Sequence, residues 1–448
     1  MFPSKALFIF RRDLRLVDNT TLQYLVENNF CIAPVFIFDP RQYEDNQFKS
    51  EHAFSFLLES LAELEEEISN LGGRLFTIQG IAEEALHDLL KANPEIKCVG
   101  LNRDYTPFSL MRDEAIRKVC NQLNVEVISF DDALIVRPDV IQANSIPLHT
   151  FSSFFKNAPL PNQPVPLIRP SFSSLKWQIF DYKTFFKKSL ARRRFDLFQG
   201  GRKRGLELLR RLKSIDYSRR DFPAEEQVSY LSPHHKFGTI SVRETFYSTN
   251  DASYRRQLYW RDFFTLHLFF KPKILNSNYL EVFDNFPWEW DEAKFQKWTQ
   301  GETGFPIIDA GIRQLVQTGY MHNRVRLIVA SFLCKDLRFH WKAGEKFFAN
   351  HLVDYDPAVN NGNWQWCAGT GLDAMPAFRI FNPWLQQKKF DPDATYIKAW
   401  VPELKDLTAS DIHSIYDLKL TNYPPPMIDH YEERAKTLKL VSNLKAKN

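Results

Sequence analysis

The spacing of apolar residues changes along this chain, and the change limits the folds it can adopt. In the first 130 residues, short apolar runs alternate with amphipathic stretches such as 53–71 and 82–92. This alternation implies right-handed crossovers and a parallel sheet with helices on both faces. Five runs are typical of strands: 6–10, 31–38, 74–78, 98–101 and 125–129. We therefore predict a doubly wound α/β domain of about five strands over residues 1–130.

From about residue 200 onwards the apolar period is that of a helix. Pro306 stands where a helix begins, Gly319 stands where it ends, and an apolar stripe between them comprises Ile308, Ile312, Leu315 and Val316. A second helix is predicted over 321–337, with these residues facing inward: Val325, Val329, Phe332 and Leu333. Residues 201–448 are expected to form a larger all-α domain. The proline-rich stretch 131–200 is expected to be an extended connector between the domains.

Length and composition exclude several classes of protein. A chain of 448 residues that is 44% apolar can bury at least two cores. The five cysteines are scattered without a Cys-x-x-Cys pair, so no metal site is expected, and an odd number suits a reducing compartment. No signal-like segment or bilayer-length apolar run is found, which indicates a cytoplasmic protein that does not enter membranes.

Positive charge crowds into residues 187–220, where Arg192, Arg193 and Arg194 are adjacent. Such a run is usually a solvated face, and an anionic polymer is the alternative partner. Both interpretations stay open.

The densest group of polar and aromatic residues lies in segment 354–366. It holds Asp354, Asp356, Asn360, Trp364 and Trp366 with almost no aliphatic residue between them. Tryptophan is readily oxidised and offers a large face for stacking, whereas asparagine can orient a ring nitrogen without adding charge. Ordinary core packing is the alternative for the two tryptophans.

Three other segments of the helical region carry polar chemistry. Ser229 and Ser232 precede a proline-started helix, an arrangement that suits phosphate as well as simple capping. Gln257 and Trp260 lie three residues apart and share a helix face, which suits a base edge and its ring. Segment 321–327 places Arg324 and Arg326 on different faces of a helix.

Taken in order and spacing, these segments resemble the photolyase and cryptochrome flavoproteins, closest in motif to class I cyclobutane pyrimidine dimer photolyases. The resemblance runs from about Leu7 to Leu407. It includes the opening Phe-Arg-Arg-Asp-Leu-Arg, Tyr105-Thr-Pro, Trp-Arg-Asp at 260–262, Thr-Gly-Phe-Pro-Ile-Ile-Asp at 303–309 and Phe-Arg-Ile-Phe-Asn-Pro at 378–383.

The resemblance implies an FAD, used as FADH⁻, in the helical domain of a light-driven enzyme. The implied flavin contacts are Tyr217, Val228, Ser229, Tyr230, Leu231, Ser232, Arg326, Asp354, Tyr355, Asp356 and Asn360. Asn360 matches the position that faces flavin N5, where an amide is similar to repair enzymes. A neutral amide adds no negative charge beside an anionic flavin. Trp364, Trp341 and Trp288 match the electron-transfer chain of the family.

The resemblance also implies a lesion pocket for UV-damaged DNA. Its residues are Gln257, Trp260, Arg261, Asn323, Arg324, Leu327, Trp366 and Gln386. The implied activity is that of a deoxyribodipyrimidine photo-lyase, a monomer that needs no protein partner. Gln257 departs from the glutamate of the best-known dimer enzymes and also occurs in enzymes for the (6-4) product.

Asn323 and Leu327 occupy the positions where (6-4) enzymes carry histidines, so that chemistry lacks its acid here. Dimer repair is therefore expected, with (6-4) repair and blue-light sensing by a cryptochrome as the alternatives. In the α/β domain, Phe108 and Ser109 replace the amide and carboxylate of folate-binding relatives. A second chromophore there could be a folate, a deazaflavin or a flavin.

Overall fold

The computed structural model describes residues 4–44, 46–191, 198–376, 378–417 and 422–446. The chain forms two compact units. Unit 1 comprises Met1–Leu148, Ser152–Ser214 and Ser229–Pro272. Unit 2 comprises His149–Phe151, Ile215–Val228 and Lys273–Asn448.

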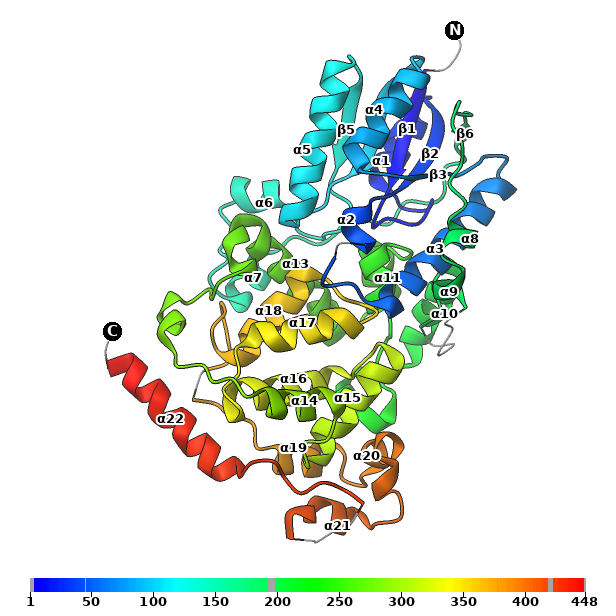
Figure 1. The fold of residues 1–448 in the computed structure, drawn as a ribbon. Helices are drawn as coiled ribbons and strands as arrows, with labels where there is room; N and C mark the ends of the chain where they lie inside the picture. Colours follow the sequence, from blue (N-terminus) through cyan, green and yellow to red (C-terminus); the bar gives the residue numbers. More distant parts are fainter. Residues whose placement is uncertain (1–3, 45, 192–197, 377, 418–421, 447–448) are drawn as a thin grey trace. The chain divides into compact units, whose positions relative to one another are not determined.

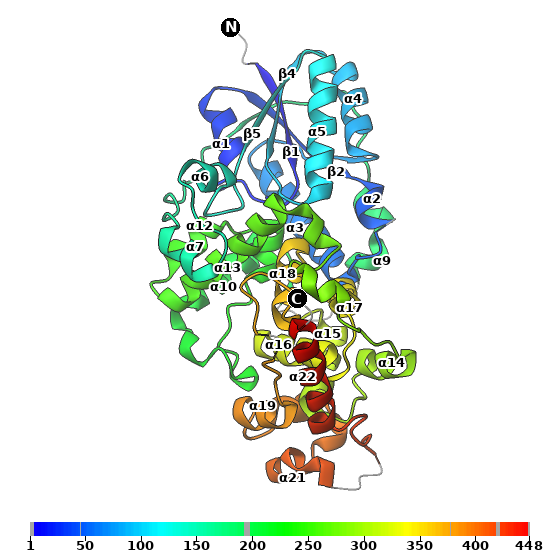
Figure 2. The ribbon, with the colours of Figure 1, turned by 90° about the vertical axis from the view of Figure 1, so that its left-hand side faces the viewer.

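Unit 1 is built on a parallel sheet, visible in Figures 1 and 2 as the blue and cyan arrows. The strands are β1 (Lys5–Phe10), β2 (Cys31–Phe38), β3 (Phe76–Gln79), β4 (Ile96–Asn102) and β5 (Glu126–Phe130). Their order is β3-β2-β1-β4-β5, and every pair is parallel. A short strand β6 (Ser171–Phe172) pairs with β2. The predicted sheet of about five parallel strands is confirmed.

Both faces of the sheet are covered by helices, because strand residues alternate between the two faces. Leu7 and Ile9 pack in one buried cluster with Leu86 and Ile116 of α4 and α5. On the other face, Gly100 lies so close to Leu25 of α1 that a side chain at this position would collide with it. The helices that end within unit 1 are listed with their bounds: α1 (Thr20–Glu27), α2 (Pro40–Tyr43), α3 (Glu51–Asn70), α4 (Ala82–Ala92), α5 (Pro107–Gln122), α6 (Pro138–Ala143), α7 (Phe151–Asn157), α8 (Tyr182–Phe185), α9 (Lys187–Leu190), α10 (Arg202–Arg211), α11 (Ser232–Phe237), α12 (Val242–Ser248) and α13 (Ala252–Phe270).

The stretch that the sequence indicates as a connector, 131–200, contains four of these short helices, α6 to α9, as well as β6. Residues 192–197 lie outside the described residues. The two paired residues of β6 are too few to produce a recognisable strand pattern in the sequence.

Unit 2 is helical. Its helices are α14 (Glu292–Gln300), α15 (Pro306–Thr318), α16 (Asn323–Ser331), α17 (Trp341–His351), α18 (Pro357–Ala368), α19 (Pro383–Phe390), α20 (Thr395–Trp400), α21 (Ala409–His413) and α22 (His430–Ala446). The π-helical turn η7 (Phe332–Asp336) continues α16. Among the described residues, every helix falls short of the length and apolarity that a bilayer crossing needs.

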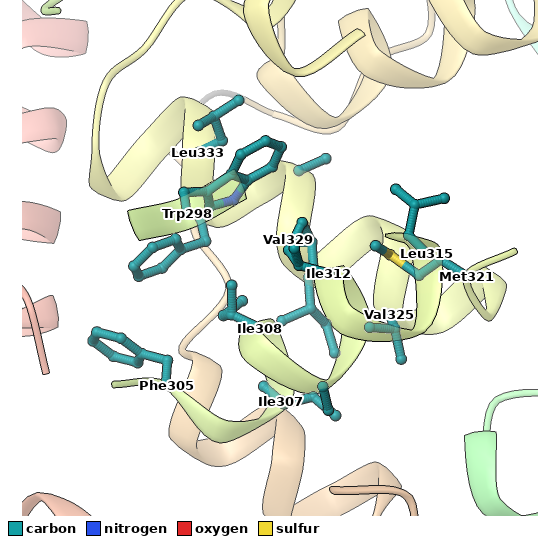
Figure 3. Packing of buried hydrophobic residues seen from close by; sticks show 14 of the residues in the cluster. Trp298, Phe305, Ile307, Ile308, Ile312, Leu315, Met321, Val325, Val329 and Leu333 are labelled. Carbon is teal, nitrogen blue, oxygen red and sulfur yellow. The ribbon is translucent and has the colours of Figure 1, made fainter. Parts of the chain in front are cut away.

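The core of unit 2 forms where α15 and α16 meet (Figure 3). Helix α15 begins at Pro306, and Gly319 ends it with a φ of 74°, as predicted. Ile308 and Ile312 are fully buried. A side chain at Gly311 would overlap Val325, so this glycine permits the close approach of the two helices.

One residue of the predicted apolar stripe lies elsewhere. Val316 is 39% exposed, whereas Leu315 is completely buried. Successive residues of a helix are about 100° apart, which takes Val316 past the edge of the buried stripe. The predicted inward residues of the next helix, Val325, Val329, Phe332 and Leu333, are all buried.

Candidate functional site

An ion pair joins α16 to the loop that precedes α18 in unit 2. Arg326 Nη2 lies 3.0 Å from Asp354 Oδ2, and the Asp354 side chain is only 7% exposed. Arg326 Nε also donates to the carbonyl oxygen of Met321 across 2.7 Å. These two bonds fix the orientation of the Arg326 guanidinium group. The structure thus brings together Arg326 and Asp354, two of the residues that the sequence indicates as flavin contacts.

The start of α18 orders the next two candidates. Asp356 caps the helix, accepting from the main-chain N–H groups of Ala358 and Val359 at 2.9 and 3.1 Å. Asn360, one turn further on, is buried and donates its side-chain amide to the carbonyl oxygen of Glu345 across 3.2 Å. The side-chain oxygen of Asn360 accepts no hydrogen bond from the described residues. Asn360 therefore offers a fixed acceptor to a bound group.

Glu345 is a buried acid that was not predicted from the sequence. Burial raises its pKa from the ordinary 4.5 to about 8, although a hydrogen bond with Asn361 opposes the shift. The carboxyl is consequently protonated at neutral pH. The signal was present in the sequence, because Trp341, Glu345 and Phe348 follow the spacing of one helix face and place an acid on an apolar stripe.

The other flavin candidates of unit 2 lie on its irregular segments. Tyr217 opens a short 3-10 turn, and the Arg220 guanidinium stands 4.8 Å from the centre of its ring. Val228 is buried. Tyr355 lies between the two aspartates and is partly buried, and this burial raises the pKa of its hydroxyl.

Four flavin candidates belong to unit 1. Ser229 Oγ accepts from the N–H of Leu231 at 3.3 Å and from the Tyr254 hydroxyl at 3.2 Å. Tyr230 has a φ of 55°, a left-handed conformation that turns the chain sharply before the next helix. Helix α11 then begins at Ser232, with proline at its start as the sequence indicates.

The three tryptophans of the predicted electron chain all lie in unit 2. Trp341 and Trp364 are buried, and Trp364 lies against Gly344, where a side chain would overlap its ring. Gly344 follows Trp341 by one helical turn. The ring of His340 lies 5.4 Å from that of Trp341 and 5.1 Å from that of Trp288, measured between ring centroids. Aromatic contacts therefore continue from Trp341 outward to Trp288.

The lesion candidates of unit 1 lie on α13. Gln257 and Trp260 are both half-buried, and Gln257 donates to the carbonyl oxygen of Ser253 at 3.2 Å. The Trp260 ring packs against Phe264 with centroids 5.5 Å apart. Arg261 donates to the carbonyl oxygen of Ala133, an internal contact of unit 1.

The lesion candidates of unit 2 lie on three helices. On α16, Asn323 is exposed, Leu327 is half-buried, and Arg324 lies 2.6 Å from Asp221 with its guanidinium over the ring of Phe390. Trp366 on α18 and Gln386 on α19 are half-buried.

His322, the residue before α16, is occupied with structure. Its Nδ1 accepts from the N–H of Arg324 at 3.2 Å, so it caps the helix. Burial lowers the pKa of His322 to about 4. The imidazole is therefore neutral at ordinary pH, and its capping nitrogen is not a proton donor.

Part of the basic stretch is neutralised by acids within unit 1. Arg202 pairs with Glu244 at 2.6 Å, and Lys203 pairs with Glu66 at 3.2 Å. Arg192, Arg193 and Arg194 fall outside the described residues.

Charged groups also gather after the strands of unit 1, where parallel sheets bind ligands. The guanidinium groups of Arg41 and Arg112 both lie near the ring of Phe108, at 5.3 and 5.8 Å from its centre. Ser109 donates to Asp104 across 2.9 Å. Phe108 and Ser109, the two positions that differ from folate-binding relatives, are thus in contact with charged side chains.

Comparison with known proteins identifies the family. Residues 6–169 match the model of DNA photolyase, and residues 254–443 match the FAD binding domain of DNA photolyase. The deoxyribodipyrimidine photo-lyase of Agrobacterium fabrum is 36% identical over 96% of each chain.

Two solved structures are similar over nearly the whole chain. An archaeal photolyase from Sulfolobus tokodaii, which contains two FAD molecules, is 44% identical with a TM-score of 0.90, covering 98% of this chain and 100% of that one. A cryptochrome from Synechocystis is 28% identical with a TM-score of 0.87, covering 98% and 99%. The predictions of an FAD-binding domain and of a photo-lyase enzyme are confirmed, and the chain belongs to the DNA photolyase family.

Proposed function

We propose that this protein repairs cyclobutane pyrimidine dimers in DNA with light. Family membership supports DNA photolyase function, and the state of His322 supports the dimer as the lesion. Repair of the (6-4) product needs proton transfer, yet Asn323 and Leu327 carry no acidic group, and His322 is a neutral helix cap. Splitting a dimer needs an electron that leaves and returns, with little acid-base work.

The residues of unit 2 fit a reduced flavin. Asn360 offers a fixed side-chain oxygen that can accept a hydrogen bond from an N–H group of the flavin. Arg326 supplies a positive charge, and Asp354 neutralises it when no flavin is bound. Further contacts with the flavin are proposed for Tyr217, Val228, Tyr355 and Asp356. Contacts with its phosphates and ribityl chain are proposed for Ser229, Tyr230, Leu231 and Ser232. When bound and photoexcited, the reduced FAD supplies one electron to the dimer and takes it back after ring splitting.

The proposed role of Trp364, Trp341 and Trp288 is to deliver electrons inward when the cofactor is oxidised. Two of the three are buried, and the third continues the line of rings through His340. Burial of the first two indoles keeps water from their radicals, which favours transfer between rings over side reactions.

The lesion would be held by aromatic and polar groups. Trp260 and Trp366 are proposed to stack on the extruded dimer, with Gln257 and Gln386 hydrogen-bonding its edges. Extrusion costs a few kcal/mol, less than for an intact pair, because damage has already weakened the pairing. Four further residues are proposed to contact the damaged DNA around the dimer: Asn323, Arg324, Leu327 and Arg261. Contacts to the DNA phosphates would make binding sensitive to salt.

A second chromophore is proposed for unit 1. The two FAD molecules of the Sulfolobus tokodaii photolyase support a flavin among the three candidates. Phe108 and the guanidinium groups near its ring offer stacking and charge for such a group. We further propose a cytoplasmic monomer with DNA as its partner.

Chromatographic product analysis of two oligonucleotides, one carrying a thymine dimer and one the (6-4) product, tests the choice of lesion. The reduced, flavin-loaded protein is illuminated with each. Restoration of the dimer substrate alone is the expected result. Restoration of the (6-4) substrate would overturn the lesion assignment, and failure on both with reduced flavin bound would favour the light-sensor function of a cryptochrome.

A further inference from the structure

Trp364 packs against Trp298 and against the turn of α17 that follows Trp341, and these two indoles differ in polarity. The ring of Trp298 lies 6.5 Å from that of Trp364 between centroids. Trp298 is fully buried among Phe295, Phe347 and Phe348, and its indole N–H has no hydrogen-bond partner among the described residues. A positive charge on Trp298 would therefore find no hydrogen-bond acceptor at its nitrogen among the described residues.

Trp341, which precedes Gly344 by one turn of α17, is held by a polar relay. Its indole Nε1–H donates to Asn278 Oδ1 across 2.7 Å, and both side chains are buried. Asn278 Nδ2 in turn donates to Asp284 Oδ1 across 2.6 Å. The Asp284 carboxylate, on the exposed turn η6 (Glu281–Asn285), is thus coupled through one amide to a buried indole.

A cation also lies over the ring of Trp341. Lys342 Nζ lies 5.9 Å from the centre of the Trp341 ring. This charge opposes oxidation of Trp341, and the carboxylate of Asp284 offsets it. Without the Asp284 carboxylate, the Lys342 charge would make Trp341 harder to oxidise.

We propose that Asn278 and Asp284 are positioning residues that make Trp341, and not Trp298, the electron donor to oxidised Trp364. The inference rests on the proposed use of the tryptophan chain. An amide oxygen is too weak a base to remove the indole proton, so oxidised Trp341 keeps its proton and its charge. The polarised amide and the carboxylate behind it stabilise that charge.

One electron passes from Trp364 to the photoexcited oxidised flavin, one passes from Trp341 to Trp364, and one passes from Trp288 to Trp341. Trp288 then releases its indole proton to water and regains an electron and a proton from a thiol in solution.

The ring between Trp341 and Trp288 is suited to this transfer. Burial lowers the pKa of His340 to about 4, opposed by the nearby Asp284 carboxylate and reinforced by Lys342. A neutral imidazole between the two indoles does not repel a migrating positive charge, as an imidazolium would.

The test is time-resolved absorption after a laser flash, on flavin-loaded protein with the flavin oxidised. Asp284→Asn retains a hydrogen-bond acceptor for Asn278 on an exposed turn and removes only the charge. We expect the yield of long-lived tryptophan radical to fall about tenfold, because oxidised Trp341 loses the stabilising charge of one nearby carboxylate. Glu281→Gln removes a charge from the same turn and is expected to match the wild type.

Asn278→Asp supplies a distinct spectroscopic signature. A carboxylate can accept the indole proton, so the radical is expected as the neutral indolyl form, trapped at Trp341, instead of the cation. Adding Trp298→Phe to Asp284→Asn should remove the residual signal, whereas Trp298→Phe alone should leave the wild-type yield unchanged. Thermal unfolding and flavin content establish that each variant is folded and loaded.

Trp364→Phe separates the two ways of failing. If it leaves radical formation intact, the tryptophan chain of the proposed function is wrong. If Trp364→Phe abolishes the radical while Asp284→Asn and Asn278→Asp both behave as the wild type, the chain stands and the role of Asn278 and Asp284 is wrong. A large loss in Trp298→Phe alone would likewise overturn the inference.

Discussion

Asn360 donates its side-chain amide to the main-chain carbonyl oxygen of Glu345 across 3.2 Å, and this bond ties α18 to α17. It also determines which end of the amide is left to face a ligand. The chemistry proposed for the flavin therefore depends on a bond whose two partners are 15 residues apart in sequence.

Asn360→Asp should make the bound FAD harder to reduce. The substitution places a carboxylate beside an anionic reduced flavin, and two like charges about 4 Å apart cost roughly 1 to 4 kcal/mol, depending on the local dielectric. The midpoint potential measured by spectroelectrochemistry should fall. Asn363→Asp changes a partly exposed asparagine of the same helix and should leave the potential within error. An unchanged potential in Asn360→Asp would place the flavin elsewhere.

Glu345→Gln should remove a pH dependence from the stability of the flavin-free protein. The pKa of Glu345 is raised to about 8 in the folded state from an ordinary 4.5, so the folded protein holds this proton more tightly than the unfolded chain. Stability therefore declines between about pH 4.5 and pH 8, by a few kcal/mol, and no further above that window.

Denaturant unfolding from pH 5 to pH 9 measures this difference. The stability of Glu345→Gln relative to the wild type should increase across the window, since glutamine has no proton to lose. A constant difference between the two proteins would mean that Glu345 is already ionised in the folded state.

Gly344→Ala should destabilise unit 2 and displace Trp364. The added methyl group would overlap the ring of Trp364, and overpacking of a core costs typically 1–3 kcal/mol. Thermal unfolding should show a lower midpoint, and light-driven reduction of the flavin should slow. Asn350→Ala, at an exposed position of the same helix, should stay within about 0.5 kcal/mol of the wild type. Equal midpoints for the two variants would exclude the close contact.

Trp260→Ala should weaken binding of dimer-containing DNA more than binding of undamaged DNA. Stacking of an aromatic ring on one base contributes about 1–3 kcal/mol. Fluorescence anisotropy should show a higher Kd for the damaged duplex but the same salt dependence, because no phosphate contact is removed. Trp290→Ala removes a tryptophan that is 56% exposed and outside the proposed pocket, and should bind as the wild type. Equal loss for both DNAs in Trp260→Ala would argue against stacking on the lesion.

Local sequence was sufficient for the elements whose signals are local. The apolar strand 31–38 and the helix between Pro306 and Gly319 were predicted at their observed bounds, because their caps and periods lie within the element itself. Val316 was misplaced, since a period alone does not fix the edge of a buried stripe.

The site depends on partners that no local pattern indicates. Arg326 and Asp354 are 28 residues apart, and Trp341 and Asn278 are 63 apart. The first pair could be named only through resemblance to a family. The second was missed, because an asparagine in a loop gives no sign of which indole it will accept from.

Thymine absorbance during illumination tests the central claim most directly. Chemically reduced, flavin-loaded protein is mixed with a dimer-containing oligonucleotide in the dark and then exposed to near-UV light. The account predicts that absorbance recovers only during illumination and stops when the light is removed, including for Trp364→Phe, whose flavin has been reduced without the tryptophan chain. No recovery in the light, with reduced FAD bound and DNA in excess, would contradict it.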